Sequence, residues 1–231
     1  WDRIYHFMNN REWYDTRGLP YTLGFLFYGI PGAGKTSMIK AIANITQRHP
    51  ININFGNIKT KTQLKQLFYD DTIFCIEKNN HINPNPEMLK IPTSKRLYVM
   101  EDIDCISNID VLKQRNTNAN AKETKKKKLN SFNKSFADEE SDEENDNIDL
   151  STILNVLDGT LENPDRILII TSNYPEILDK ALIRPGRIDM MIEFKLASHK
   201  IMKEMYFSLY DKHPEDKHIE MIPEYFWTPA E

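Results

Sequence analysis

The chain has 231 residues, of which 40% are apolar, and a formal net charge of −4 at pH 7. This apolar content is enough for the core of one large domain, and the acidic balance argues against a broad basic surface for nucleic acid. No apolar run approaches the ~18 residues that a membrane-spanning helix needs.

Short apolar segments alternate with helix-length segments along the chain. The expected strands span residues 24–29, 51–55, 97–101, 166–172 and 190–194, and the expected helices span residues 35–48, 61–69, 150–157 and 197–209. Strands that alternate with helices are typical of a parallel sheet covered by helices. The sequence therefore predicts an α/β fold.

We expect a lead-in over residues 1–20, a core over 21–195 and the start of a helical C-terminal lid over 196–231. Because the chain starts without Met, we expect an excised domain. We expect the lid to be cut short, since the sequence stops in a stretch rich in Pro and aromatic residues. Residues from about 107 to 147 carry KKKK (125–128), then an acidic block, and almost no large apolar side chains. We expect a disordered insertion there; a nucleic-acid or nuclear-targeting role for KKKK is the alternative.

A phosphate-binding loop is predicted at GIPGAGKT, residues 29–36, which fits G-x-x-x-x-G-K-[ST] between an expected strand and an expected helix. Glycines let the backbone N–H groups converge on a phosphate at the positive end of the helix. Lys35 is expected to bridge the β- and γ-phosphates, and Thr36 to place its hydroxyl on Mg²⁺. The predicted nucleotide-binding residues are Gly29, Ile30, Pro31, Gly32, Ala33, Gly34, Lys35, Thr36 and Ser37.

A second candidate site is LYVMEDID, residues 97–104, where an apolar run ends in three carboxylates. In parallel sheets, ligands bind at this carboxyl end of the strands. ATP-hydrolysing enzymes usually carry Asp before Glu, whereas here Glu101 precedes Asp102. Strand alternation places Glu101 on one face and Asp102 with Asp104 on the other.

Two readings of this acid order remain open. In the first, Glu101 takes the Mg²⁺ side and Asp102 orients and polarises the attacking water. In the second, the motif is shifted by one residue, so that Asp102 lies on the metal and Ile103 replaces the base in a dead site. We favour the first, with Thr36, Glu101 and Asp102 as the residues around the metal.

The loop is followed in a fixed order by MEDID (100–104), ITSN (170–173) and LIRPGR (182–187). Together these segments resemble the AAA family of ring-forming ATPases, over most of residues 12–210 apart from the insertion. The resemblance implies a P-loop NTPase fold, ATP and Mg²⁺ as cofactors, and a homo-oligomeric ring of six or seven subunits. It implies that Asn173 is the sensor asparagine and that Arg184 and Arg187 are arginine fingers that reach the neighbouring subunit's site.

Residues 13–29 and the MEDIDC order also resemble one clade of that family, the mitochondrial inner-membrane chaperone that inserts the Rieske protein into respiratory complex III. The charged insertion is similar to that of its plant relatives. The likeness implies a membrane segment absent from this chain and a mitochondrial inner-membrane location, with a viral or protist relative elsewhere as the alternative. It also favours an active site with the exchanged acids.

Each of these residues also has a purely structural interpretation. Either arginine could form an ordinary surface ion pair, and Asn173 could cap the turn that follows it. For the arginines, a finger supplied in trans can contribute ~10³–10⁵ in rate, and the Pro-Gly between them makes a stiff turn that could present both outward.

The leading function is an ATP-driven chaperone or protein translocase. Phe55 is expected to end a strand, and NIKTKT (57–62) after it is polar and basic. We therefore expect that this ring does not grip unfolded chains with an aromatic pore-loop residue. A nucleic-acid motor or clamp loader is the alternative, supported by Lys59, Lys61 and Lys65. A nucleotide-binding scaffold without hydrolysis is less favoured.

Overall fold

The computed structural model describes residues 1–55, 57, 58, 60–75, 87–104, 148, 150–161 and 163–229. Its centre is a five-stranded sheet in the order β2-β5-β6-β1-β7, in which every pairing is parallel. The strands are β1 (Thr22–Gly29), β2 (His49–Asn52), β5 (Arg96–Met100), β6 (Arg166–Ser172) and β7 (Met190–Phe194). The predicted α/β fold with a parallel sheet is confirmed.

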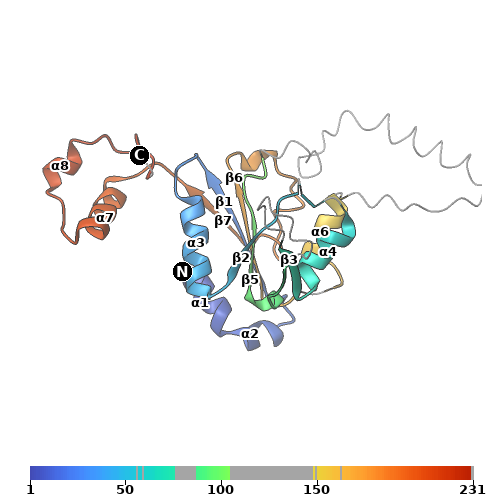
Figure 1. Ribbon diagram of the computed structural model, residues 1–231. Helices are drawn as coiled ribbons and strands as arrows, with labels where there is room; N and C mark the ends of the chain where they lie inside the picture. The colour runs from blue at the N-terminus through green and yellow to red at the C-terminus, as the bar shows by residue number, and fades with distance from the viewer. Residues whose placement is uncertain are drawn as a thin grey trace, which may run out of the picture.

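Helices cover both faces of this sheet (Figure 1). One face carries α1 (Asp2–Asn9) and α3 (Lys35–Thr46), and the other carries α4 (Lys61–Tyr69) and α6 (Leu150–Asp158). The expected insertion over 107–147 lies outside the described residues.

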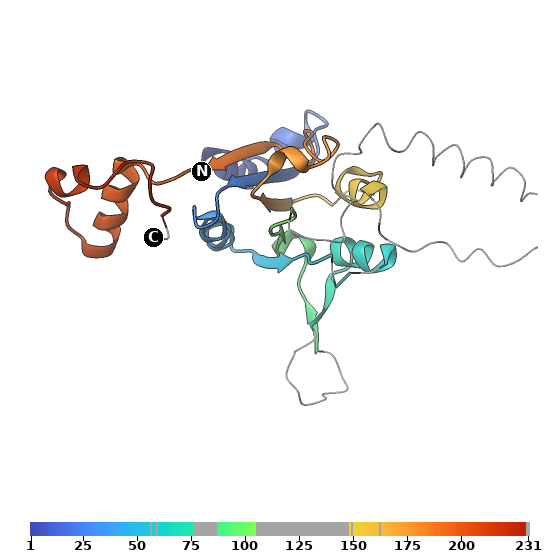
Figure 2. The same cartoon turned by 90° about the horizontal axis from the view of Figure 1, so that it is seen from above.

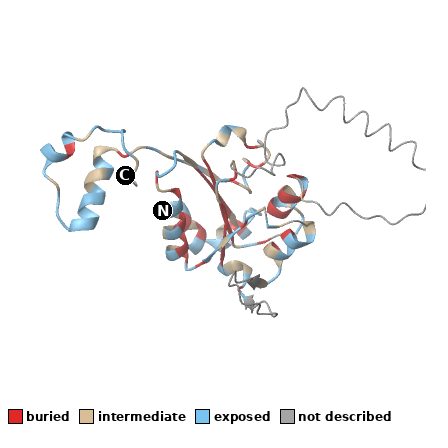
Figure 3. Ribbon diagram, turned by 45° about the horizontal axis from the view of Figure 1, so that its top comes forward, coloured by how far each residue is buried: buried red, intermediate tan, exposed pale blue. Residues whose placement is uncertain are grey.

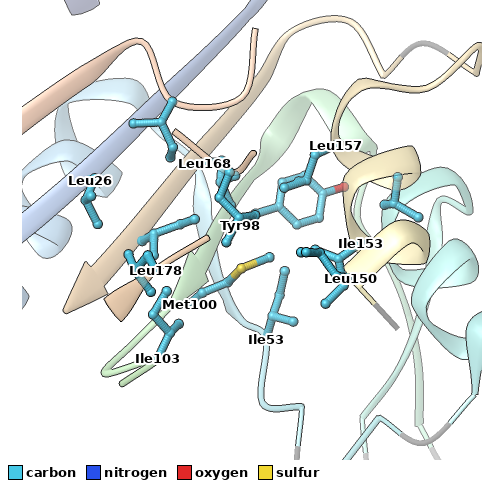
Figure 4. Close-up of a cluster of buried hydrophobic side chains, with 14 of the residues drawn as sticks. Leu26, Ile53, Tyr98, Met100, Ile103, Leu150, Ile153, Leu157, Leu168 and Leu178 are labelled. Carbon is cyan, nitrogen blue, oxygen red and sulfur yellow. The ribbon is translucent and has the colours of Figure 1, made fainter. Parts of the chain in front are cut away.

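Side chains alternate between two hydrophobic clusters along each central strand, as a pleated strand requires. In β1, Phe25 and Phe27 join the cluster under α1 and α3, whereas Leu26 joins the cluster under α4 and α6. Tyr98 and Met100 of β5 point into this second cluster (Figure 4). Burying each such side chain stabilises the fold by roughly 1.5–3 kcal/mol, so both faces of the sheet are fixed by packing.

The N-terminal segment belongs to the same packing unit. Ile4 and Phe7 of α1 are buried, and Tyr14 of α2 (Arg11–Asp15) is buried in the same cluster as Phe25. The Tyr21 hydroxyl donates a hydrogen bond of 2.8 Å to the carbonyl of Phe7, which ties α1 to the start of β1. The lead-in therefore supports the amino end of β1.

The strand predicted to end at Phe55 is shorter than expected. The pairing of β2 with β5 ends at Asn52, opposite Val99, and only the N–H of Ile53 continues it, 2.7 Å from the Val99 carbonyl. Phe55 lies beyond the strand, partly buried against the cluster under α4 and α6. The expectation that Phe55 ends the strand was wrong because β5 offers no further partner past Met100.

Two further parts extend from this body. An antiparallel pair, β3 (Thr72–Cys75) and β4 (Glu87–Lys90), projects away from the main sheet (Figure 2). The C-terminal part holds α7 (His199–Tyr210) and α8 (Asp216–Glu220), and α7 has no buried residue (Figure 3). Short 3-10 turns occur at Thr93–Lys95 and Pro175–Ile177. In the described part of the chain, no helix is both long and apolar enough to cross a membrane.

Candidate nucleotide site

The phosphate loop connects β1 to α3 and depends on glycine for two different reasons. A Cβ at Gly29 would lie 2.1 Å from the carbonyl oxygen of Phe194, so no side chain fits there. A Cβ at Gly34 would meet nothing within 4 Å, but its φ of 98° is left-handed, and it immediately precedes α3. The N–H groups of the first turn of α3 lack helical partners and are the groups that bind anions.

The loop borders a pocket of about 290 Å³ at the carboxyl end of the sheet. Its lining residues are Pro31, Gly32, Gly34, Lys35, Thr36, Ser37, Asp102 and Asn173. The structure thus brings six of the nine predicted loop residues to one pocket with Asp102 and Asn173. Of the other three, Ala33 is buried, and Gly29 and Ile30 contribute their carbonyls to the contacts described next.

Lys35 lies at the centre of this arrangement. Its ammonium donates hydrogen bonds to the carbonyls of Gly29 (2.7 Å) and Ile30 (3.0 Å) and to Oδ1 of Asn173 (2.8 Å). These bonds use all three donors of the ammonium, and the side chain is only 8% exposed. Lys35 and Asn173 are 138 positions apart but meet because each follows one of the adjacent strands β1 and β6.

Glu101 faces the phosphate loop and is held at both of its carboxylate oxygens. Its Oε1 accepts a hydrogen bond of 3.1 Å from the Thr36 hydroxyl, and its Oε2 accepts one of 3.1 Å from the Asn52 side chain. Two of the three residues predicted to lie around the metal, Thr36 and Glu101, are therefore in direct contact.

Asp102 reaches the pocket through a local change of backbone direction. Its φ is 47°, in the left-handed region that non-glycine residues rarely adopt, and its N–H donates a hydrogen bond of 2.8 Å to the Thr171 hydroxyl. The expected strand alternation does not apply here, because β5 ends at Met100 before the acids begin. Glu101 and Asp102 therefore lie at the same loop–strand junction.

Ile103 is 2% exposed and belongs to the hydrophobic cluster under α4 and α6 (Figure 4). This burial does not fit the shifted reading of the motif, in which Ile103 would occupy the position of a base beside the nucleotide. Asp104 instead returns to the site: its Oδ1 accepts the Asn173 N–H at 3.0 Å and its Oδ2 accepts the Asn173 amide at 3.4 Å.

For three polar residues of this site, Asn52, Thr171 and Asp104, the sequence predicted no role. Asp104 fixes the amide of Asn173, whose oxygen faces Lys35, while Thr171 fixes the backbone of Asp102. For Asp104 a signal existed, since it is the third carboxylate of the acidic run. For Asn52 and Thr171 the only signal is their position at the carboxyl ends of strands.

The two arginines of LIRPGR lie differently from the prediction that both face outward. Arg184 is exposed, and its side chain makes no hydrogen bond or ion pair within the part of the chain that the structure describes. The Arg187 side chain is 13% exposed, lies with Nε 3.5 Å from the Asp158 carboxylate, and donates a hydrogen bond to the Ala181 carbonyl. The outward presentation of Arg187 was therefore wrong; its guanidinium is turned back toward α6.

The donor set of this pocket fits a magnesium nucleotide. Mg²⁺ takes oxygen ligands, commonly one or two carboxylates completed by phosphate and water, and Thr36 and Glu101 offer such oxygens side by side. Lys35 and the loop N–H groups suit the phosphates. Among the described residues no group of three or more His, Cys, Asp or Glu could hold a metal alone, and Mg²⁺ with phosphate does not require one.

A larger cavity of about 460 Å³ lies among α7, α8 and the segment after them. Its lining includes Met202, Tyr206, Leu209 and Trp227, and it lacks the cations and loop N–H groups that phosphates require. The phosphate-loop pocket is therefore the nucleotide candidate, although it is smaller.

Comparison with known proteins agrees with this geometry. The Dictyostelium discoideum protein named "Probable mitochondrial chaperone BCS1-B" is 32% identical over 97% of this chain and 45% of its own length. A Schizosaccharomyces pombe protein named "Probable mitochondrial chaperone bcs1" is 30% identical over 93% of this chain and 37% of its own. This chain therefore spans less than half of either relative.

A third relative matches over most of both chains. Protein L572 of Acanthamoeba polyphaga mimivirus, whose name places it among AAA family ATPases, is 33% identical over 84% of this chain and 89% of its own. Residues 25–196 match the family described as "ATPase family associated with various cellular activities (AAA)". The chain belongs to the AAA family of ATPases.

Proposed function

We propose that this chain hydrolyses ATP with Mg²⁺ within an oligomeric ring and uses the hydrolysis to remodel or translocate a protein substrate. The observation that supports this most is the meeting of Lys35, Asp102 and Asn173 at one pocket, next to the contact between Thr36 and Glu101. Phosphoryl transfer depends on positioning and on charge stabilisation, and these are the groups that both need.

Each residue then has a defined part in hydrolysis. The loop N–H groups and Lys35 would bind the phosphates, and Thr36 with Glu101 would hold Mg²⁺, whose positive charge would offset the charge of the phosphate oxygens. Asp102 accepts a hydrogen bond from the attacking water and orients it. Asn173, whose amide is fixed by Asp104, contacts the γ-phosphate side of the pocket, and the bond from Lys35 to Asn173 gives way when phosphate takes that donor.

The finger role falls to Arg184. Its exposed guanidinium is free of partners in the described residues, as a group that acts on another subunit must be. Arg187, paired with Asp158, serves to hold the turn. Rings are the general assembly of this family, and six or seven subunits are proposed here.

A protein substrate and a mitochondrial location are proposed from the names of the Dictyostelium and yeast relatives. The mimivirus relative keeps a location outside the mitochondrion as the alternative. A nucleic-acid motor remains the alternative: of the basic residues that favour it, Lys61 and Lys65 lie on α4, whereas Lys59 and KKKK lie outside the described residues.

The test is phosphate release by the purified oligomer with Asp102→Asn as the variant. The amide keeps the shape of the side chain but is a poor acceptor for the water proton, so turnover is expected to fall by about 10²–10⁴-fold while ATP still binds. Full turnover in Asp102→Asn would contradict the assignment of Asp102. An unaltered protein that binds ATP without releasing phosphate would favour the scaffold reading.

A further inference from the structure

The turn that carries Arg184 is joined to β1 by one carboxylate. Asp189 accepts a hydrogen bond from the Gly186 N–H at Oδ1 (3.1 Å) and another from the Gly24 N–H at Oδ2 (2.8 Å). The N–H of Asp189 donates to the Gly24 carbonyl at 2.8 Å. A single side chain therefore bridges the turn and the strand.

The backbones of the turn and the strand are in direct contact at this bridge. A Cβ at Gly24 would lie 1.7 Å from the carbonyl oxygen of Arg187, so only glycine allows the turn to come this close. The Gly186 carbonyl accepts hydrogen bonds from the Thr22 hydroxyl (3.4 Å) and from Nη2 of Arg166 (3.2 Å). The turn is thus fixed on two sides of Gly186.

These contacts leave one charged side chain of the turn, that of Arg184, without a partner among the described residues. Within residues 184–187, the Arg187 side chain is engaged by α6, and the carbonyl of Arg184 accepts the N–H groups of Arg187 and Ile188 at 3.0 and 2.9 Å. The Arg184 side chain is exposed. The backbone position of Arg184 is therefore set by a rigid turn, and its guanidinium can move only through rotation about the side-chain bonds.

We propose that Asp189 is a positioning residue for Arg184: by bridging Gly186 and Gly24, it sets the point from which Arg184 reaches the nucleotide of the neighbouring subunit. This inference rests on the proposed role of Arg184 in trans. A displacement of about 1 Å at a catalytic group can cost about 10²-fold in rate, so a residue that touches no nucleotide can still control turnover.

Asp189→Asn tests the bridge with little change in volume. A carboxylate accepts both N–H groups, whereas an amide has one acceptor oxygen and turns its NH₂ toward a backbone donor. We expect kcat to fall about 10- to 100-fold with KM changed less than about threefold, because binding in the same subunit's pocket is untouched. Asp15→Asn makes the same chemical change at an exposed residue of α2 and is expected to leave both constants unchanged.

Mixed oligomers separate a displaced finger from a damaged fold. Asp102→Asn subunits lack a working site but keep their finger, and Arg184→Ala subunits keep their site but lack the finger. Asp189→Asn subunits co-expressed with Asp102→Asn subunits are expected to regain turnover, since intact fingers then serve intact sites. Co-expression of Asp189→Asn with Arg184→Ala is expected to regain none.

If Asp189→Asn is unstable, a second variant, Gly186→Ala, tests the same turn through its rescue pattern and its melting temperature. Gly186→Ala strains the φ of 87° at that residue, while its Cβ would meet only the Asp158 side chain at 3.6 Å, so it shifts the turn without filling a close contact. We expect it to show the same rescue pattern, with a melting temperature lowered by about 2–8 °C through the strain at this one residue.

Different outcomes would overturn the positioning role of Asp189 and the proposed function. Recovery with Arg184→Ala instead of Asp102→Asn, recovery with neither, or parental turnover in both Asp189→Asn and Gly186→Ala overturns the positioning role. No turnover in the parent oligomer overturns the proposed function and the inference with it.

Discussion

The two ends of β1 carry the two halves of the proposed catalytic site and are constructed differently. At the carboxyl end, side chains from several segments meet at one pocket, and Lys35 and Glu101 use their polar atoms on partners in the same chain. At the amino end, hydrogen bonds to backbone groups fix a turn from which Arg184 extends without a partner in the described residues.

The two halves differ in the kind of partner that they need. The pocket needs only a ligand, because its cation, carboxylates and amide already lie within one subunit. In its proposed finger role the turn needs a second protein surface, because an exposed guanidinium gains little until it meets an anion. Substitutions at the two ends should therefore fail in different ways.

The largest expected difference is between the two arginines. Arg184→Ala should lower kcat by about 10³-fold or more while ATP affinity and melting temperature stay close to the parent's, because a finger acts in the transition state. Arg187→Ala should instead lower the melting temperature by about 2–8 °C, since it removes roughly 1–2 kcal/mol of partly buried polar contacts.

Steady-state kinetics and thermal melts on both variants measure these two effects. The contrast breaks if Arg187→Ala abolishes turnover without affecting the melting temperature, since Arg187 would then leave Asp158 to act as a finger itself.

A smaller effect is expected at the carboxyl end from Glu101→Gln. The amide keeps its reach to Thr36 but loses the charge that a divalent cation requires, so the Mg²⁺ concentration needed for tight nucleotide binding should rise about 10- to 100-fold. Affinity for nucleotide without Mg²⁺ should change little. Titration of a fluorescent ATP analogue at several Mg²⁺ concentrations measures both, with Glu204→Gln on exposed α7 as the matched control.

If Glu101→Gln weakens nucleotide binding equally with and without Mg²⁺, Glu101 does not contribute to Mg²⁺ binding. The carboxyl end would then have to bind Mg²⁺ through Asp102, as the shifted reading of the motif requires.

The smallest effect concerns the sheet between the two ends. Burial raises the pKa of Tyr98, whose hydroxyl donates to the Phe68 carbonyl at 3.3 Å. The folded state thus favours the protonated phenol, so this contribution to stability is complete below the ordinary pKa near 10 and is lost as the pH rises through the raised pKa. Melting temperatures of the parent should fall above about pH 10.

Tyr98→Phe should weaken that alkaline fall and cost about 1 kcal/mol at neutral pH through the lost hydrogen bond. If the nucleotide pocket and the Arg184 turn melt at separate temperatures in these scans, the sheet does not unfold as one cooperative unit. The two ends of β1 would then not belong to one rigid body.

Much of the fold could be predicted because it depends on local pattern. The strands at 166–172 and 190–194 and the helix at 61–69 match the observed bounds, since apolar runs and caps such as Thr60 are local signals. The β3–β4 pair and the early end of β2 were not predicted. Both depend on which segments pair across the chain, which spacing along the sequence does not encode.

For the site, too, the sequence predicted which residue types are present but not the direction in which each of them points. The motif at 29–36 identified the residue types around the phosphate, and spacing placed Glu101 and Asp102 at a strand end. The inward turn of Arg187 and the left-handed backbone at Asp102 depend on neighbours far along the chain, Asp158 for the first and Thr171 for the second. Such partners become visible only once the strands are assembled.

The two glycines of β1 also decide what kind of motion this strand can transmit. Gly24 lies against the Arg187 carbonyl and Gly29 against the Phe194 carbonyl, at distances that exclude any side chain. A slide of β1 by one position would bring Phe25 or Tyr28 into these gaps, so the strand is locked in register at both ends. A slide of β1 along its own axis is therefore excluded as a way for the nucleotide pocket to move the turn that carries Arg184.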